Sequence, residues 1–298
     1  MSKLETVDRA LDKYKDHKDE QVRLTLAVLG GALREAARRT DGRLASGHVA
    51  PAWSSADVEA ALKGGAPLIG STTIDIDREG LLDAVVGVAT ALMDAYKDDE
   101  DMKAAFVALD WDRYVDDEAV ELMRRDPDAW IGRLEESLES PVETSIVLPA
   151  CLLGAKVMLS PYARDAGEAF RRLYENDDTP HFDRALKCPF CGGDPLIAHV
   201  AQTPSHGKEK MLVCATCSTR WPFERIRCAV CGEMATSELS YVHDEGDSAH
   251  RLHVCNTCET AFPTVFLNDA AAFSPVVESI VMMGLEESYF TEAPNPAQ

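Results

Sequence analysis

Apolar residues recur at helical spacing through most of residues 1–187, which predicts an all-α first domain. Residues 19–39 carry one apolar stripe, and Gly42 follows as a candidate helix stop. Residues 77–97 carry a second stripe behind acidic residues, which favour the positive N-terminal end of a helix. The two stripes consist of Val22, Leu26, Leu29 and Leu33, and of Leu81, Val85, Val88 and Leu92. Shorter helical patterns follow at 101–109, 116–125, 127–139, 143–158 and 163–175.

After Lys187 the pattern changes to short β-prone runs between turn-forming clusters. Two hairpins are predicted, one from residues 195–202 and 209–214 around TPSHG, the other from 237–243 and 249–254 around DEGD. A last helix is expected after Asp269, where apolar residues again recur at roughly helical spacing, as Val276, Ile280, Met283 and Leu285.

The chain is therefore predicted to be a multi-domain α+β protein, with an all-α N-terminal domain, two tandem small β modules and a C-terminal helix. The predicted modules are of the zinc-ribbon or rubredoxin-like kind. The predicted domains are residues 1–187, 188–226, 227–268 and 269–290, followed by a frayed tail at 291–298.

Length and charge narrow the function classes. The chain has 298 residues and a formal net charge of −21, so it is long enough for about two domains, and it would repel a phosphate backbone. The N-terminus is charged from its third residue and lacks the apolar core of a secretory signal, which predicts a cytoplasmic protein. The longest apolar stretch, Ile146 to Leu159, is shorter than the roughly 20 residues needed to cross a bilayer. It predicts a buried helix rather than membrane insertion.

Eight of the nine cysteines form four CxxC pairs, which is the pattern of a metal-binding protein. Two thiolates three residues apart on a tight turn can face one cation, and two such pairs complete a tetrahedron. Gly192 and Gly232 follow two of the pairs and allow a left-handed backbone there. The four pairs are Cys188/Cys191, Cys214/Cys217, Cys228/Cys231 and Cys255/Cys258.

An internal repeat indicates which pairs share a metal ion. CPFCG at residue 188 matches CAVCG at residue 228, and VCATCSTRWP at residue 213 matches VCNTCETAFP at residue 254. We therefore predict one site from the first two pairs and one from the last two. An interleaved, cross-braced pairing stays open, and so does a pair of disulfides, although a reducing cytoplasm disfavours the latter.

Each four-cysteine site is expected to be a structural staple for a core too small to fold alone, with no catalytic residue. Tetrahedral sulfur ligands suit either zinc or a single iron, so the expected cofactors are two metal ions per chain, zinc or iron. Cys151 and the aromatic residues Trp221 and Phe262 are interpreted as core residues. The histidines near the cysteines are expected on hairpin surfaces, with His253 as the one possible extra ligand; they are His199, His206, His243, His250 and His253.

The order CPFCG, then CATCSTRWPFERIRCAVC, then CNTC and a short acidic helix resembles the formate dehydrogenase accessory protein FdhE family, over residues 188–290. The motif CxxCxxxWxxxRxxCxxC of that family matches Cys214, Cys217, Trp221, Arg225, Cys228 and Cys231. The resemblance implies a helical domain before two rubredoxin-like modules, and a non-enzymatic cytoplasmic maturation factor or chaperone. It also implies a partner, the catalytic subunit of formate dehydrogenase or of a related molybdenum or tungsten enzyme. We assign partner binding to the segment with Trp221 and Arg225.

Two other functions remain open from the residues. One is electron transfer or iron sensing through rubredoxin-type iron centres. The other is a zinc ribbon for nucleic acid, which the acidic charge disfavours. The sequence carries no G-x-S-x-G, Walker A, H-E-x-x-H or G-x-G-x-x-G motif, so no enzymatic reaction is expected.

Overall fold

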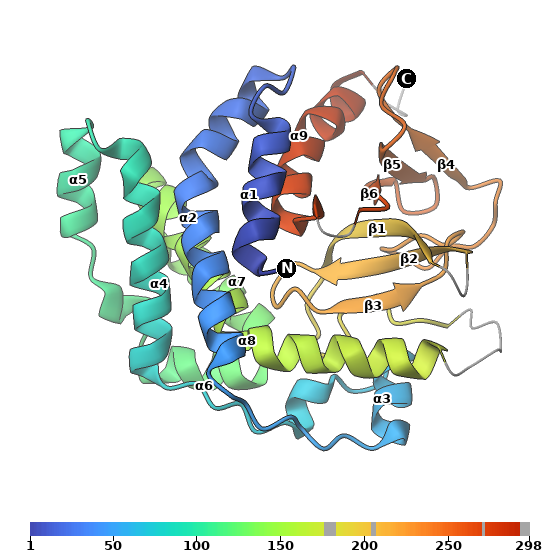
Figure 1. Cartoon of the computed structure of the whole chain (residues 1–298), viewed down its shortest axis with the longest axis horizontal. Helices are drawn as coiled ribbons and strands as arrows, with labels where there is room; N and C mark the ends of the chain where they lie inside the picture. The colour runs from blue at the N-terminus through green and yellow to red at the C-terminus, as the bar shows by residue number, and fades with distance from the viewer. Residues whose placement is uncertain (176–182, 204–206, 270–271, 293–298) are drawn as a thin grey trace.

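The computed structural model describes residues 1–175, 183–203, 207–269 and 272–292. Helices form the N-terminal region, and a six-stranded sheet with one further helix forms the C-terminal region (Figure 1). The N-terminal helices are α1 (Lys3–Tyr14), α2 (Glu20–Ala45), α3 (Ser55–Leu62), α4 (Arg78–Met93), α5 (Glu100–Val107), α6 (Asp117–Arg125), α7 (Pro127–Ser137) and α8 (Pro141–Glu175).

The helices predicted from the two long apolar stripes are confirmed as α2 and α4, each capped by an aspartate side chain at its N-terminus. The predicted stop at Gly42 is wrong. Gly42 lies inside α2, and the helix ends at Ala45, two residues before Gly47. Gly47 has a φ of +84°, the left-handed conformation that ends many helices and that glycine adopts without strain.

The two helices predicted at 143–158 and 163–175 are one 35-residue helix, α8, which contains Pro149 and Pro161. A proline inside a helix removes one hydrogen bond, and burial on several sides of α8 outweighs that loss. The stretch from Ile146 to Leu159 is buried for most of its length, as predicted. By length and composition α8 could cross a membrane, yet 56% of its most apolar window is buried inside the protein.

Close backbone approach holds α2, α4 and α8 together at the centre of the helical region. A Cβ atom at Gly31 of α2 would lie 2.5 Å from the carbonyl oxygen of Ala91 in α4. A Cβ atom at Gly154 of α8 would lie 2.7 Å from a methyl group of Val85 in α4. Glycine at these two positions therefore permits the helix packing that the core requires.

Both predicted hairpins are present, and each is extended by a third strand. The strands are β1 (Pro195–Thr203), β2 (Gly207–Cys214), β3 (Arg220–Phe223), β4 (Leu239–Val242), β5 (His250–Cys255) and β6 (Thr260–Phe266). Residues 204–206 of the predicted TPSHG turn lie outside the described residues. All six strands form a single sheet in the order β3-β2-β1-β6-β5-β4, with β1 and β6 parallel and every other pair antiparallel.

The strand order repeats the duplicated sequence. Strands β1, β2 and β3 of the first half correspond to β4, β5 and β6 of the second half. The free edge of β1 pairs with β6, which is the equivalent of β3. The parallel pairing aligns Ala198 with Thr264 and Val200 with Phe266. The two predicted modules are thereby joined through backbone hydrogen bonds, and the boundaries given for them stay predictions.

Alternate strand residues face two different cores. Leu212, Trp221 and Phe262 belong to the core of the helical region, which α8 covers on one side of the sheet. Ile197 and Val265 belong to a smaller core beneath the last helix, α9 (Pro275–Glu292), on the other side (Figure 1). The structure thus confirms the predicted α+β fold class. The predicted C-terminal helix begins at Pro275. Residues 293–298 of the predicted tail lie outside the described part of the chain.

Candidate metal centres

The structure brings the eight paired cysteines into two separate groups of four. Each group contains four Sγ atoms that all lie within 4.8 Å of one another and could hold a metal ion. The grouping is the one that the sequence repeat predicts, and the interleaved alternative is wrong. The groups are Cys188, Cys191, Cys214 and Cys217 (the first cluster), and Cys228, Cys231, Cys255 and Cys258 (the second cluster).

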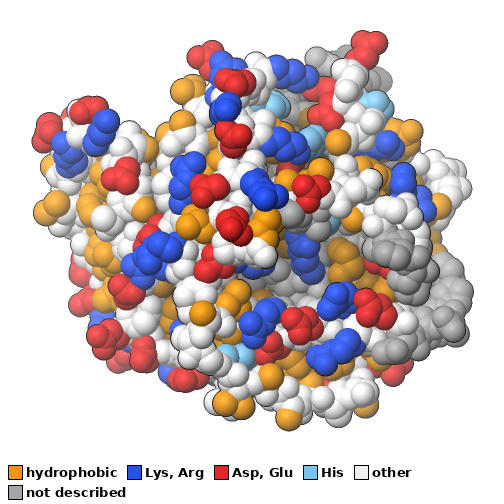
Figure 2. All heavy atoms as spheres, viewed as in Figure 1, with side chains coloured by type: hydrophobic (Ala, Val, Ile, Leu, Met, Phe, Trp, Pro, Cys, Tyr) orange, Lys and Arg blue, Asp and Glu red, His pale blue; other side chains and the backbone are white. Residues whose placement is uncertain are grey.

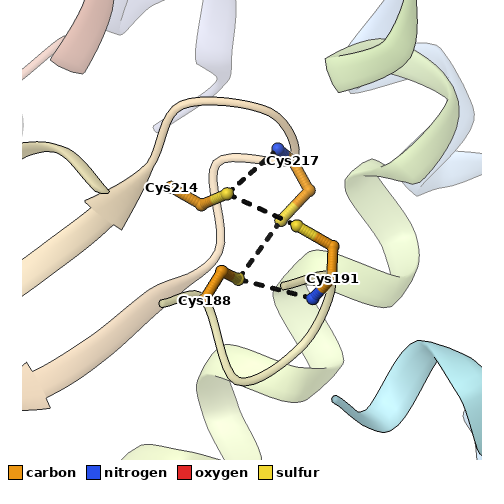
Figure 3. A group of neighbouring side chains, drawn as sticks. All are labelled: Cys188, Cys191, Cys214 and Cys217. Atoms are coloured by element: carbon orange, nitrogen blue, oxygen red, sulfur yellow. Dashed lines mark hydrogen bonds between the residues drawn. The ribbon is translucent and has the colours of Figure 1, made fainter. Parts of the chain in front are cut away.

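In the first cluster two loops face each other and direct their sulfur atoms inward (Figure 3). One loop precedes β1, and the other joins β2 to β3. The Sγ atoms of Cys188 and Cys217 are 3.7 Å apart, and those of Cys191 and Cys214 are 3.4 Å apart. Four sulfurs at a Zn–S distance of 2.3 Å lie about 3.8 Å from one another in a regular tetrahedron. The first cluster therefore fits a tetrahedral metal ion.

The same local backbone geometry shapes the loops of both clusters. Gly192 and Gly232 have φ values of +87° and +82°, as their positions in the sequence predict. Each of these glycines donates its N–H to the carbonyl of the first cysteine in its pair. The other two pairs are followed by Ser218 and Glu259, which adopt positive φ without being glycine. Backbone strain at these two positions is therefore part of the site.

Backbone N–H groups also point at the sulfur atoms. The N–H groups of Thr216 and Cys217 donate to Cys214 Sγ over 3.3 and 3.5 Å. In the second cluster Val230 and Cys231 donate to Cys228 Sγ over 3.4 and 3.5 Å. Burial raises the pKa of the Cys228 thiol, but these donors and the side chains of Cys231 and Cys258 outweigh it and bring the pKa to about 7. Such bonds stabilise the thiolate form that binds metal.

A threonine hydroxyl completes each cluster in the same place. Thr219 Oγ1 lies 3.0 Å from Cys217 Sγ, and Thr260 Oγ1 lies 2.8 Å from Cys258 Sγ. The two threonines occupy equivalent positions of the repeat, 41 residues apart. The duplication therefore extends beyond the ligands to the hydrogen bonds around them, which set ligand orientation in metal sites.

The two clusters differ in exposure. All four cysteines of the first cluster are buried. In the second cluster Cys231 is exposed and Cys258 is half-buried, although the Cys228–Cys258 and Cys231–Cys255 sulfur distances are both 3.7 Å. The second cluster thus has the same tetrahedral dimensions but an open side toward solvent.

The first cluster lies in the core of the helical region. Its four cysteines belong to the same hydrophobic core as α2, α4 and α8. The N–H groups of Leu68 and Ile69 donate to the carbonyls of Pro189 and Phe190, inside the first cysteine pair. Thr216, between the cysteines of the second pair, donates to the carboxylate of Asp128 over 2.8 Å. The first cluster therefore fixes the sheet to the helices.

The remaining cysteine and the aromatic residues are in cores, as predicted. Cys151 is completely buried in α8, and burial raises the pKa of its thiol. Trp221 and Phe262 occupy equivalent positions of the repeat and are both buried. The indole N–H of Trp221 donates to the carbonyl of Ala185. All nine cysteines carry free sulfurs.

The partner-binding roles predicted for Trp221 and Arg225 stay predictions. Trp221 is fully buried, so it could affect a partner only by positioning the exposed residues of its segment. Arg225 is exposed and lines a cavity of about 170 Å³ beside the second cluster, together with Tyr241 and His253. This exposed arginine is therefore the member of the pair that can contact a partner directly.

The histidines that the structure describes are not members of either cluster. His253 lines the cavity beside the second cluster, and His243 is exposed on its hairpin, as predicted. The expectation of surface positions is wrong for His199 and His250, which are buried between the sheet and α9. His199 stacks on Phe273 and contacts the carbonyl oxygen of Leu267, and burial lowers its pKa to about 4. His206 lies outside the described residues.

Sequence reasoning missed a polar cluster that joins three distant segments. Tyr14 of α1, His250 of β5 and Glu278 of α9 are buried and hydrogen-bonded to one another. The only local signal was the presence of polar residues in otherwise apolar patterns, such as Glu278 between Val277 and Ile280.

Comparisons with known proteins give one consistent result. A family model described as "FdhE, central domain" matches residues 187–225. The "Protein FdhE homolog" of Aquifex aeolicus is 24% identical over 99 residues, which are 33% of this chain and 35% of that protein. The "Protein FdhE homolog" of Pseudomonas putida is 24% identical over 120 residues, which are 37% of each chain. The matched segment thus spans little more than a third of these relatives.

The fold is similar over a much longer span. The crystal structure of the FdhE protein from Pseudomonas aeruginosa matches with a TM-score of 0.57 at 16% identity, over 98% of this chain and 92% of that one. These findings together support the resemblance to the FdhE family.

Proposed function

Starting from this resemblance, we propose that the protein is a non-enzymatic accessory factor of the FdhE kind, acting in the cytoplasm. It binds one metal ion in each four-cysteine cluster and holds an immature enzyme subunit during maturation. The client is the catalytic subunit of formate dehydrogenase or of a related molybdenum or tungsten enzyme. The observation that carries the proposal is the pair of tetrahedral cysteine clusters within a fold that matches FdhE over nearly the whole chain.

The ligand sets favour a structural role for the metal. A catalytic zinc site has three protein ligands and an open position, whereas a structural site has four. Each cluster here offers four sulfur ligands, and all four cysteines of the first cluster are buried. A bound ion would cross-link the loops next to the strands. One ion would be held by the site residues Cys188, Cys191, Cys214 and Cys217. The other would be held by Cys228, Cys231, Cys255 and Cys258.

A nucleic-acid-binding function gains no comparable support. Such proteins need a basic surface, and this chain has a net charge of −21. On the face drawn in Figure 2, Lys and Arg side chains are interspersed with Asp and Glu.

A second candidate function is supported by the exposed side of the second cluster. Rubredoxin-type iron centres exchange electrons near the protein surface, and Cys231 is exposed. Iron at this cluster would make electron transfer or iron sensing the better hypothesis. Zinc has no redox chemistry in proteins and would exclude it.

The first experiment is elemental analysis of protein purified without oxygen, together with its visible spectrum. Two zinc ions per chain and no visible absorption support the structural role. Two iron ions with thiolate-to-iron absorption favour the redox alternative. A chain that holds neither metal, with its thiols reduced, contradicts both candidates.

The client is tested by affinity purification of the tagged protein from its own cells grown under conditions that induce formate dehydrogenase. Enrichment of the catalytic subunit, lost in Arg225→Glu, supports the proposal. The matched control is Arg125→Glu, at the exposed end of α6. Repeated failure to enrich any molybdenum or tungsten enzyme subunit would overturn the proposed client.

A further inference from the structure

A lysine ammonium group near the first cluster is shielded from solvent and has no hydrogen-bond partner among the described residues. This group is the Nζ atom of Lys156, which lies in α8. Burial lowers the pKa of Lys156, and the negative charges of Cys214, Cys217 and Cys191 act in the opposite direction. The groups that favour the charged form of Lys156 are therefore the sulfurs of the first cluster.

A second buried lysine lies beside the second cluster. Lys210 of β2 is only 2% exposed, and its Nζ atom donates to the carbonyl of Arg227 over 3.3 Å. Arg227 directly precedes Cys228, and Lys210 lines the same cavity as Cys228 and Cys255. Burial lowers the pKa of Lys210 to about 8, against the opposing effect of the charge on Cys228 and Glu224.

Buried lysines are rare unless a negative charge compensates them. A divalent ion with four thiolates carries a net charge of −2. Burying this charge costs free energy, fully in the first cluster and in part in the second. Each of the two clusters has one buried ammonium group near it, and the two lysines come from unrelated parts of the fold. The buried ammonium groups and the buried negative charge of the metal–thiolate centres would compensate each other.

We propose that Lys156 and Lys210 are the counter-cations of the two metal–thiolate centres, Lys156 of the first and Lys210 of the second. The inference rests on the metal binding in the proposed function. It assigns a role to two residues that are not metal ligands. Lys156 lies outside the sequence repeat, and Lys210 aligns with Arg251 in the second copy.

The origin of each lysine links metal binding to the assembly of the chain. Lys156 belongs to the helical region and serves the first cluster, while Lys210 belongs to the first half of the sheet and serves the second cluster. Each centre is thus completed by the unit that precedes it in the chain. A metal ion in either cluster is held more tightly when the preceding unit is docked, and reciprocally the ion favours that docking.

The test compares zinc release from the loaded full-length protein, by titration with a competing chelator, in wild type, Lys156→Met and Lys210→Met. Methionine keeps the length of the apolar stem and removes the charge. We expect each variant to lose affinity by about tenfold or more for one of its two ions and to keep the other, in line with the effect of other residues that support metal ligands. Lys156→Arg and Lys210→Arg, which keep the charge, should retain more affinity than the methionine variants.

The control is Lys187→Met, next to Cys188 in sequence but with a side chain that is 62% exposed. Solvent screens its charge, so zinc release should remain within about twofold of wild type. Circular dichroism of the loaded variants checks that each is folded. In metal-free protein the lysine no longer faces the fixed negative charge of a metal–thiolate centre, so the methionine variants should be as stable as wild type or more stable.

Two results would overturn the inference. One is unchanged zinc release in both methionine variants, and the other is an equal loss at both sites in each variant, which would indicate a general loss of packing. If wild type itself binds no metal, the proposed function fails. If wild type binds two ions and the methionine variants bind them equally well, only the role of the lysines fails.

Discussion

The hydroxyl of Tyr14, in the first helix, donates a hydrogen bond to the carboxylate of Glu278, in the last helix, over 2.7 Å. His250 of β5 contacts the same carboxylate oxygen over 2.9 Å and places its other ring nitrogen 2.7 Å from Asp247. Lys13 faces the second oxygen of Glu278 at 3.4 Å. The cluster therefore ties both ends of the described chain to the half of the sheet that carries the second metal cluster.

The His250 side chain is expected to make stability depend on pH. Burial lowers the pKa of His250, but hydrogen bonds and charges from Glu278 and Asp247 outweigh it, so the pKa is raised in the folded protein. The protonated form therefore stabilises the fold. This contribution is fully present below the unfolded-state pKa, about 6.5, and is lost as the pH rises through the folded-state pKa.

The measurement is denaturant unfolding of zinc-loaded wild type and His250→Gln from about pH 6.5 upward. The difference in unfolding free energy between the two proteins should be largest at the low end and shrink as pH rises. Taking the difference cancels titrations that both proteins share, such as those of the cysteines. A difference that grows with pH would contradict a protonated His250.

Tyr14→Phe should destabilise the protein by about 1–3 kcal/mol, because it removes a buried hydrogen bond to a charged group. Tyr14 is 6% exposed, and Glu278 is completely buried, so water cannot replace the lost donor. The control is Tyr241→Phe, at a tyrosine that is 55% exposed, where a change within about 0.5 kcal/mol is expected. Thermal unfolding of both variants decides the matter, and equal effects would show that the Tyr14 contact contributes nothing.

The ligands and their pairing could be predicted because the information is local. A CxxC pair fixes its own turn, and the repeat places equivalent residues such as Cys188 and Cys228 in register. The long apolar stripes of α2 and α4 were equally readable, since helical spacing depends on neighbours along the chain. Helix α1 also has a local sequence signal, the capping box between Ser2 and Glu5, which lies outside the apolar stripes.

Contacts between distant segments could not be predicted in this way. Nothing near Val200 specifies that it aligns with Phe266 in a parallel pair, so two modules were expected where one sheet forms. The bond from Tyr14 to Glu278 joins residues 264 positions apart. The burial of the first cluster in the helical core likewise depends on Leu68 and Ile69 meeting Pro189 and Phe190, which no periodicity encodes.

A pair of glycine variants within α2 should change stability in opposite directions. Gly31→Ala places a Cβ atom 2.5 Å from the carbonyl oxygen of Ala91, so α2 and α4 must move apart, and we expect a loss of about 1–3 kcal/mol. Gly42→Ala meets no atom within 4 Å and should stabilise the helix by about 0.5–1 kcal/mol. Chemical denaturation measures both, and a Gly31→Ala protein as stable as wild type would contradict the close helix contact.

A chelator should remove the metal ions from the two clusters one after the other. Cys231 of the second cluster is exposed, whereas the first cluster is buried in the core of the helical region, so a chelator is expected to release one ion quickly and the other slowly. The matched variants are Cys231→Ser and Cys191→Ser, each at the second cysteine of its pair. Cys231→Ser should abolish the fast phase and leave helix content nearly intact. Cys191→Ser should lower the melting temperature much more, because metal binding at a structural site contributes directly to folding. Release of both ions in a single phase, with equal melting temperatures for the two variants, would show that the clusters do not differ in this way.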